Sequence, residues 1–366
     1  MPTLDQLNAQ LDRLASFEAG PFPVLSVYLD LRPDEVGRDR FEPFLRRELS
    51  DRVSTYPASG PERKSLQDDA ERIQSSVTDV DASLNGLAIF SCSGSGLFEA
   101  VPLAAPVGDH RLFISDLPHL YPLAKVMDEY PRYLALVADT NAARIVVFAM
   151  NAVEKSDRIE GVKTRRHSMG GWSQARYQRH TENYHLHHAK EVVDAVARIV
   201  RDERIEKIVV AGDDVIVPML REQFPKDIAE RIVDVVKVGM HANEREVLDK
   251  TIAALQQKDA ETDRERVDQL LGAYRANGLA CVGLAATRRA FELGQVDELL
   301  VPGSADVIRG VDKKPGDTQP ERSAEERAAD ELIVLARQTS ARVRFIEDAA
   351  LLEPAGGVGA FLRFKI

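Results

Sequence analysis

The sequence predicts a mixed α/β protein with three domains. At 366 residues the chain is too long for one ordinary hydrophobic core. Its composition, 44% apolar and 29% charged residues, is typical of a globular protein. Short apolar runs with strand character alternate with amphipathic segments of helical spacing. We therefore expect domains at residues 1–130, 131–258 and 259–366. The second is expected to have a mixed sheet that carries a Gly-Gly loop, and the third to be an α/β sandwich.

The first domain is expected to open with an amphipathic helix at residues 4–17 and a strand at 24–30. The charged stretch 39–80 has mostly helical character. Two further strands, at 86–91 and 96–103, flank a Gly-Ser-Gly sequence that is typical of a hairpin turn.

The second domain begins with two strands, at 133–139 and 143–149, joined by Thr-Asn, and a third strand at 153–159. Apolar residues recur at helical spacing from Leu186 to Val200, which predicts one long amphipathic helix. The rest of this domain is expected to hold a strand at 207–211, a helix ending at 224, a strand at 231–238 and a helix from 243.

The third domain follows a charged helical connector at 259–276. The polar stretch 302–322 is expected to be a mobile insertion. The regular elements expected here are strands at 280–285, 298–301, 343–347 and 358–366 and helices at 287–293 and 323–338.

Cysteine content, hydropathy and charge restrict the class of protein. Cys92 and Cys281 lie far apart without a Cys-x-x-Cys neighbour, so neither a disulfide framework nor a zinc site is expected. No apolar run approaches the length of a membrane span, and the first residues do not form a signal core, so we expect a cytoplasmic protein. With 48 Lys and Arg against 59 Asp and Glu, the net charge of −11 argues against general coating of nucleic acid.

One segment departs from this acidic balance. Between Arg158 and His180 the only acid is Glu160, and five of the eight histidines lie in or beside the segment. Its six cations are Arg158, Lys163, Arg165, Arg166, Arg176 and Arg179.

The sequence Gly170-Gly-Trp-Ser-Gln174 stands at the centre of this basic segment. A glycine pair before a helix is usually only a turn. It also permits positive φ and close approach of the backbone to a ligand, with Ser173 as a helix N-cap. Trp172 is either a core anchor or an exposed stacking residue.

Three further histidines, His185, His187 and His188, could form a metal site or a solvated helix start. No carboxylate or cysteine stands at convincing ligand spacing beside them. We therefore expect neither a metal nor another cofactor.

The stretch from Gly170 to Arg179 resembles the Gly-Gly-Gln loop of class-one peptide-release factors of archaea and eukaryotes, with Arg176-Tyr177 and Arg179 in register. The family likeness runs in order from residue 85 to the C-terminus, and the most similar group is the bacterial branch, which is related to Pelota. The other stretches that carry it are 85–90, 209–212, 279–301 and 356–364.

This resemblance implies a three-domain factor that enters the ribosomal A site and hydrolyses the peptidyl-tRNA ester. The residues that would act in hydrolysis are Gly170, Gly171 and Gln174. The partners implied are rRNA, the P-site peptidyl-tRNA and an elongation-factor-Tu-like GTPase. The residues that would bind RNA are Arg165, Arg166, His167, Trp172, Arg176 and Arg179.

Two departures from the family pattern bear on activity. Trp172 occupies the position of the family glutamine, and Gln174 lies two residues later. The first domain also lacks Asn-Ile-Lys-Ser, the family's stop-codon tetrapeptide. These departures argue against stop-codon reading and favour a rescue or hibernation role. On the resemblance as a whole, the leading hypothesis is a hydrolytic factor of the release or rescue type, and two alternatives stay open. One is a non-hydrolytic hibernation or stalling factor in the same site, and the other is an RNA-cleaving enzyme that uses the histidine cluster as acid and base.

Overall fold

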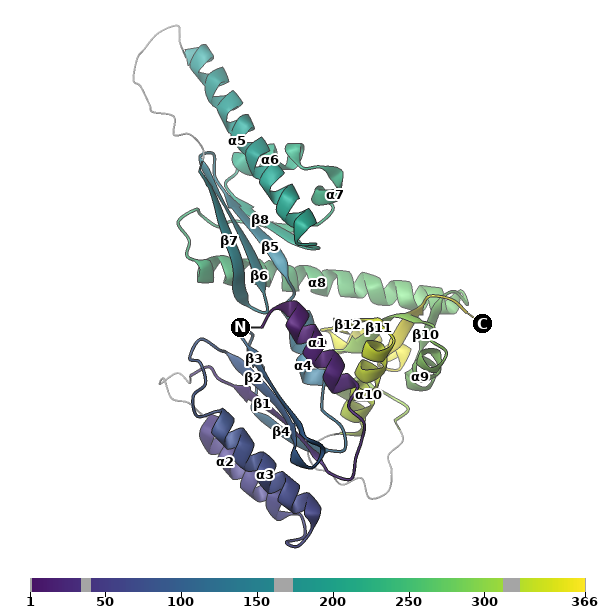
Figure 1. The fold of residues 1–366 in the computed structure, drawn as a ribbon. Helices are drawn as coiled ribbons and strands as arrows, with labels where there is room; N and C mark the ends of the chain where they lie inside the picture. Colours follow the sequence, from purple (N-terminus) through teal and green to yellow (C-terminus); the bar gives the residue numbers. More distant parts are fainter. Residues whose placement is uncertain (1, 34–40, 161–173, 312–322, 366) are drawn as a thin grey trace. The chain divides into compact units, whose positions relative to one another are not determined.

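The computed structural model describes residues 2–33, 41–160, 174–311 and 323–365 (Figure 1). These residues form three β-sheets covered by helices, which confirms the predicted mixed α/β fold. The chain divides into two compact units. The first unit combines Met1–Glu129 with Ala260–Ile366, and the second is Tyr130–Asp259. The division into three domains, at residues 1–130, 131–258 and 259–366, stays a prediction.

The N-terminal part of the first unit has a four-stranded antiparallel sheet in the order β3-β2-β1-β4. Its elements are α1 (Leu4–Ala15), β1 (Val24–Asp30), α2 (Phe41–Ser54), α3 (Pro61–Ser76), β2 (Gly86–Cys92), the 3₁₀ turn η1 (Ser93–Ser95), β3 (Leu97–Leu103), β4 (Arg111–Ser115) and α4 (Tyr121–Glu129).

The central strand β1 is buried along almost its whole length because both faces of this sheet are covered. Leu25, Val27 and Leu29 point to one face, where they pack in a core with apolar residues of α2 and α3. Tyr28 points to the other face, where its ring lies edge-on to Phe90. Strand alternation therefore gives this sheet two separate cores.

The expected helix at 4–17, the strand at 24–30 and the hairpin at 86–103 are confirmed, and the charged stretch 39–80 contains α2 and α3. Strand β4 and helix α4 were not expected from the sequence. Both are short, and Pro122 stands at the second position of α4, so neither shows a full period of its pattern.

The C-terminal part of the first unit has a mixed sheet in the order β10-β13-β11-β12. One face packs against Val267 and Leu270 of the helix that enters this part, and α9 and α10 contact strands of the same sheet. The elements are α8 (Glu244–Arg275), β10 (Ala280–Val282), α9 (Leu284–Glu292), β11 (Val296–Pro302), the 3₁₀ turn η2 (Ala305–Val307), α10 (Ala324–Gln338), β12 (Arg342–Ile346), the 3₁₀ segment η3 (Ala349–Ala355) and β13 (Gly359–Leu362).

Two expectations for this part are wrong in detail. The strand expected at 280–285 ends at Val282, because Gly283 takes a positive φ of 83° and α9 begins at the next residue. The stretch 302–322, expected to be a mobile insertion, is packed in its first half, where Ala305 and Ile308 are buried. Its second half, 312–322, lies outside the described residues.

The second unit has a five-stranded mixed sheet in the order β7-β6-β5-β8-β9, as expected for this region. Strands β5, β6 and β7 are antiparallel, while β5, β8 and β9 are parallel. The elements are β5 (Tyr133–Ala138), β6 (Ala142–Ala149), β7 (Ala152–Glu160), α5 (Gln174–Asp202), β8 (Ile208–Gly212), α6 (Ile216–Gln223), α7 (Lys226–Ala229), β9 (Ile232–Val236) and the first half of α8.

Helices cover both faces of this sheet (Figure 1). Leu134 and Leu136 of β5 pack in one core with apolar residues of α5, α6 and α7. Tyr133 and Val137 of the same strand pack in a second core with residues of α8. The connector expected at 259–276 is part of α8, one continuous helix, because no glycine or proline interrupts it between the two expected pieces.

Candidate functional site

The predicted site falls largely on residues 161–173, which lie outside the described residues. This holds for Arg165, Arg166, His167, Gly170, Gly171 and Trp172. Gln174 is the first residue of α5, and Arg176 and Arg179 follow in the same helix. Their side chains also lie outside the description, so the predicted roles of these nine residues stay predictions. What the structure describes is the scaffold on either side.

The segment 161–173 connects the end of β7 at Glu160 to the start of α5 at Gln174. The C-terminal half of α5 is held by a buried apolar stripe that includes Val192, Val196 and Val200. A helix of 29 residues is about 43 Å long at 1.5 Å per residue. In Figure 1 the N-terminal half of α5 extends past the end of the sheet.

A charged cluster ties the strand that enters this segment to the helix that leaves it. Arg132 donates hydrogen bonds to Glu154 of β7 at 2.5 Å and to Glu203, just after α5, at 2.7 Å. Lys155 of β7 bonds the other carboxylate oxygen of Glu203 at 3.0 Å.

Hydrogen bonds from Arg132 and then from Lys155 lower the pKa of Glu203, and the same bond raises the pKa of Lys155. These groups are partly exposed, so their contribution is more to geometry than to stability. This cluster was not expected from the sequence, because its members lie up to 71 residues apart.

His187 and His188 lie in different environments on α5. His187 is 75% exposed in its side chain, and its Nδ1 lies 3.4 Å from Glu191. His188 is only 2% exposed, and neither of its ring nitrogens has a hydrogen-bond partner. The expected solvated helix start is therefore wrong for His188. That residue stands four positions before Val192, on the buried stripe of α5.

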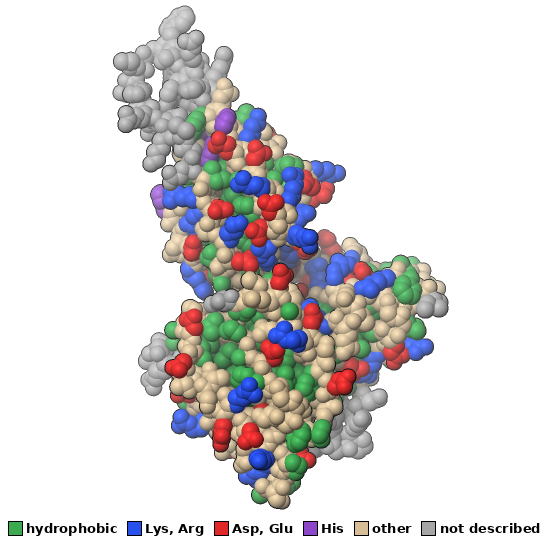
Figure 2. All heavy atoms as spheres, in the orientation of Figure 1, with side chains coloured by type: hydrophobic (Ala, Val, Ile, Leu, Met, Phe, Trp, Pro, Cys, Tyr) green, Lys and Arg blue, Asp and Glu red, His purple; other side chains and the backbone are tan. Residues whose placement is uncertain are grey.

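Within the described ranges, no group of three His, Cys, Asp or Glu side chains is placed to hold a metal ion. The histidines visible in Figure 2 all belong to the second unit, where acidic and basic side chains are interspersed on the same face. Among the helices that the structure describes, none is long and apolar enough to cross a membrane.

Family models match two adjoining parts of the chain. Residues 118–256 match "Bacterial archaeo-eukaryotic release factor family 10", and residues 260–366 match "eRF1 domain 3". The first match contains the whole segment 161–173 and both elements that flank it.

Two curated proteins resemble this chain at low sequence identity. Peptide chain release factor subunit 1 of Archaeoglobus fulgidus is 23% identical over 73% of this chain and 74% of its own length. The Pelota homolog of Thermococcus kodakarensis is 22% identical over 63% of this chain and 64% of its own length.

Two solved structures align with this chain at low TM-scores. A model of ribosome-bound archaeal Pelota and ABCE1 covers 100% of this chain and 95% of its own, at 16% identity and a TM-score of 0.43. Dom34 of S. cerevisiae, described as a translation termination-like factor that interacts with Hbs1, covers 79% of this chain and 82% of its own. It is 12% identical, with a TM-score of 0.42.

Proposed function

Because the chain belongs to the bacterial archaeo-eukaryotic release factor family, with an eRF1 domain 3, we propose that it is a ribosome factor of the release or rescue type. It is homologous to archaeal peptide chain release factor subunit 1 and to Pelota. In this proposal the protein enters the A site and hydrolyses the ester of the P-site peptidyl-tRNA. An elongation-factor-Tu-like GTPase is the proposed delivery partner, and the family membership is its support.

The observation that carries this proposal is the position of the glycine pair. Gly170 and Gly171 stand between β7 and α5, inside the region that matches the release-factor family. On one side the buried stripe of α5 holds the helix against the sheet, and on the other the Glu203 cluster holds β7. A segment carried by two such anchored elements can be presented to a distant reaction centre.

The proposed reaction needs a positioned water and a site for the developing negative charge. The water attacks the ester carbonyl carbon, the carbonyl oxygen becomes an oxyanion, and the bond to the tRNA ribose breaks as that ribose oxygen takes a proton. Backbone N–H groups at Gly171 and Trp172 are the proposed oxyanion donors, since glycine lets the backbone come close. The amide of Gln174 is the proposed group that orients the water.

The flanking cations would hold RNA rather than take part in hydrolysis. Arg165, Arg166, Arg176 and Arg179 can each pair with a phosphate, and guanidinium groups suit phosphate geometry. His167 and Trp172 would add contacts to the same RNA, the ring of Trp172 by stacking on a base. RNA binding would therefore depend mainly on the four arginines, which form the basic arms of the segment. Catalysis would depend on the sequence between them, from Gly170 to Gln174.

A second candidate function is occupancy of the A site without hydrolysis, as in hibernation or stalling. The observation that favours it is Trp172, which stands where the family has its glutamine. The missing Asn-Ile-Lys-Ser tetrapeptide points away from stop-codon reading in either case.

Release of labelled peptide from a defined ribosome complex tests the proposal, with several codons and an empty site presented in turn. We expect the protein to release peptide faster than a protein-free control on at least one complex. Ribosome co-sedimentation in the same samples measures binding separately. If the protein pellets with every complex and releases nothing from any of them, the hydrolytic proposal is wrong and occupancy is the function.

A further inference from the structure

Arg144, the third residue of β6, has a guanidinium group that is only partly satisfied. Its Nη1 donates a hydrogen bond to the carbonyl of Ala242 at 2.9 Å. Its Nε and Nη2 are buried, and among the described residues neither has a hydrogen-bond partner. Leaving buried donors of a charged group unpaired is costly in free energy. Because the residue as a whole is partly exposed, an acceptor from outside the chain needs only a small local movement to reach these two nitrogens.

The two unpaired nitrogens form the edge of the guanidinium that suits an oxyanion. Nε and Nη2 point their N–H bonds the same way, which fits two oxygens of a carboxylate or a phosphate. In the first unit Arg13 uses this edge for Glu99, at 3.0 and 3.2 Å. Arg32 uses it for Asp30, at 2.9 and 2.6 Å. The edge of Arg144 is therefore a binding site for an oxyanion.

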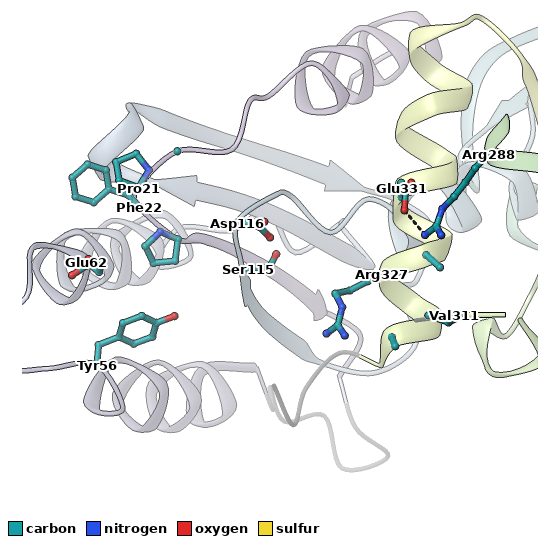
Figure 3. A pocket seen from close by; sticks show the side chains of 14 residues that line it. Pro21, Phe22, Tyr56, Glu62, Ser115, Asp116, Arg288, Val311, Arg327 and Glu331 are labelled. Atoms are coloured by element: carbon teal, nitrogen blue, oxygen red, sulfur yellow. Dashed lines mark hydrogen bonds and ion pairs between the residues drawn. The ribbon is translucent and has the colours of Figure 1, made fainter. Parts of the chain in front are cut away.

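The pocket in the first unit shows a different arrangement. It has a volume of about 670 Å³, and acids as well as arginines line it (Figure 3). Arg288 donates from Nη2 to Glu331 at 2.6 Å, and only its Nε is buried without a partner. Glu62 and Asp116 add two further carboxylates to the lining. This pocket therefore does not select an anion.

The side chains beside Arg144 in the sheet offer no acceptor. In the register of the strands it stands opposite Val137 of β5 and Arg158 of β7. Along β6 the next residue on the same face is Val146, which is buried in the core beneath α8. Apolar side chains accept no hydrogen bond, and a guanidinium only donates. An acceptor would therefore have to come from outside the sheet.

Arg144 lies at the end of the sheet where the parallel strands finish. It forms one row across the sheet with Val137, Ala211 and Val236, which stand at or near the carboxyl ends of β5, β8 and β9. In open α/β sheets, ligands bind beyond this end of the strands. The same end is where β7 leads into the segment 161–173.

The loop after β9, residues 237–243, is basic and open. It contains Ala242, which accepts the bond from Arg144, and it carries Lys237 and His241 but no acid. Both of these side chains are exposed. A side chain at Gly239 would meet no atom within 4 Å, so a bulky group can approach the backbone there.

The acids nearest to this loop do not block an anion. Asp214 lies 3.6 Å from Lys237, in a pair that is almost fully exposed. Glu244 and Glu246 are exposed at the start of α8, and Glu246 pairs with Lys250 at 3.0 Å. Exposed ion pairs of this kind are weak, so a phosphate can compete with them.

We propose that Arg144 binds a phosphate of RNA through its Nε and Nη2, with the loop 237–243 beside it. This contact belongs to the second unit and lies outside the segment 161–173. Its assignment to RNA, rather than to a carboxylate of a partner protein, rests on the proposed ribosomal function and on the basic segment that begins at the same end of the sheet. The bond to Ala242 already orients the guanidinium, which lowers the entropic cost of binding.

Ribosome co-sedimentation over a series of salt concentrations tests this with the full chain. We expect Arg144→Gln, which removes the charge, to weaken binding by about tenfold and to lower the slope of log affinity against log salt by about 0.7 to 1. Arg144→Lys keeps the charge but lacks the two-nitrogen edge. It should weaken binding less than Arg144→Gln does and keep the wild-type slope.

Arg198→Gln is the matched control, at an exposed position in the C-terminal half of α5, and should change neither affinity nor slope. Circular dichroism of each variant checks that it is folded. Thermal unfolding in sodium phosphate and in sodium chloride of equal ionic strength distinguishes a free anion from RNA. A midpoint that phosphate raises for wild type but not for Arg144→Gln, with equal ribosome binding of the two proteins, would overturn the assignment to RNA in favour of free phosphate.

Equal affinity and slope for Arg144→Gln and Arg198→Gln would overturn the inference, while ribosome binding by wild type would still support the proposed function. Weaker binding of Arg144→Gln with the wild-type slope would indicate a protein carboxylate as the acceptor, which also overturns the assignment to RNA. If wild type binds ribosomes at no salt concentration, the proposed function fails, and the RNA contact of Arg144 fails with it.

Discussion

The Nδ1 of His119 and the Oδ2 of Asp330 are in direct contact in the interior of the first unit, where the two side chains are 0% and 5% exposed. His119 follows β4, and Asp330 lies on α10, 211 residues later. The other oxygen of Asp330 binds the backbone N–H of Tyr121 at the start of α4. One carboxylate therefore satisfies two buried donors from the N-terminal half of the chain.

We expect Asp330→Ala to destabilise the first unit by about 3 kcal/mol or more, since removing one partner of a buried pair leaves the other without compensation. Urea unfolding, followed by far-UV circular dichroism, measures the loss. Glu292→Ala, at an exposed position of α9, is the control and should change stability by less than about 0.5 kcal/mol. A midpoint for Asp330→Ala equal to that of the control would mean that the contact does not hold the unit together.

Asp69 of α3 predicts a pH dependence of stability. Its Oδ1 accepts hydrogen bonds from Ser91 and Ser93, but its Oδ2 is buried without a partner. Burial raises the pKa of Asp69 above its ordinary value of 3.8, against the smaller opposite effect of those bonds. The folded protein therefore holds this proton more tightly than the unfolded chain.

For such a group, stability is fully present below the unfolded pKa and is lost as the pH rises towards the folded pKa. The loss is about 1.4 kcal/mol for each unit by which the pKa is raised. Relative to Asp69→Asn, wild type should lose stability from pH 4 upwards and then level off. Urea titrations at pH 4, 5, 6 and 7 measure this difference, with Asp51→Asn at an exposed position as the control. A difference that stays constant with pH would contradict the raised pKa.

Replacement of His188 by leucine should stabilise the second unit by about 1 kcal/mol. The buried imidazole has no partner for either nitrogen, and an apolar side chain of similar size avoids that desolvation cost. Thermal or urea unfolding measures the gain. His187→Leu, one position away but exposed, should give no gain. If His188→Leu is less stable than wild type, the imidazole has a partner that outweighs its burial.

The sequence allowed prediction of most elements of the fold, because most elements show their full period. The buried strand β5 and the stripe of α5 are examples, with a continuous apolar run and a 3.6-residue repeat. Among the elements that were missed, β4 and α4 are short, and α4 makes contacts with distant residues such as Pro302, whose carbonyl accepts a hydrogen bond from Tyr121. The local sequence pattern does not reveal contacts between residues so far apart.

The same distinction applies to the candidate functional residues: some are neighbours in the sequence, and others are brought together only by the fold. The glycine pair and its arginines are contiguous in sequence, so a resemblance could identify them. The guanidinium of Arg144 meets the carbonyl of Ala242 across 98 residues, and the cluster around Glu203 joins three separate elements. Such groupings are created by topology, and no spacing in the sequence encodes them.

Ribosome binding should depend on the basic arms of the segment. Replacing Arg165, Arg166, Arg176 and Arg179 by alanine should weaken co-sedimentation with ribosomes and flatten its salt dependence, because each lost phosphate contact removes released counterions. The control replaces four exposed arginines of the first unit, Arg46, Arg47, Arg264 and Arg289, by alanine and keeps the same change in net charge. Equal pelleting of both variants at every salt concentration would show that this segment is not the anchor.

The last prediction separates hydrolysis from occupancy. Losing one positioned donor or water-orienting group typically costs about a hundredfold or more in rate. Gln174→Ala and Gly171→Ala should therefore nearly abolish peptide release. Ribosome affinity should stay within about 1 kcal/mol, since neither change removes a phosphate contact. Gln256→Ala, an exposed glutamine of α8, is the control and should release peptide like wild type.

The two variants act by different physical routes. Gly171→Ala penalises positive φ and crowds the approach of the backbone to the ester, so its effect should persist whatever water is available. Gln174→Ala removes only an amide, so a glutamine restored at position 172 by Trp172→Gln should recover activity in the Gln174→Ala background if orientation of the water is the role. Recovery in that double variant, with no recovery when Trp172→Gln is combined with Gly171→Ala, would place the water-orienting group at this part of the segment. If Gln174→Ala releases peptide at the wild-type rate, Gln174 has no part in hydrolysis. In that case Gln174 does not take over the role of the family glutamine, whose position Trp172 occupies.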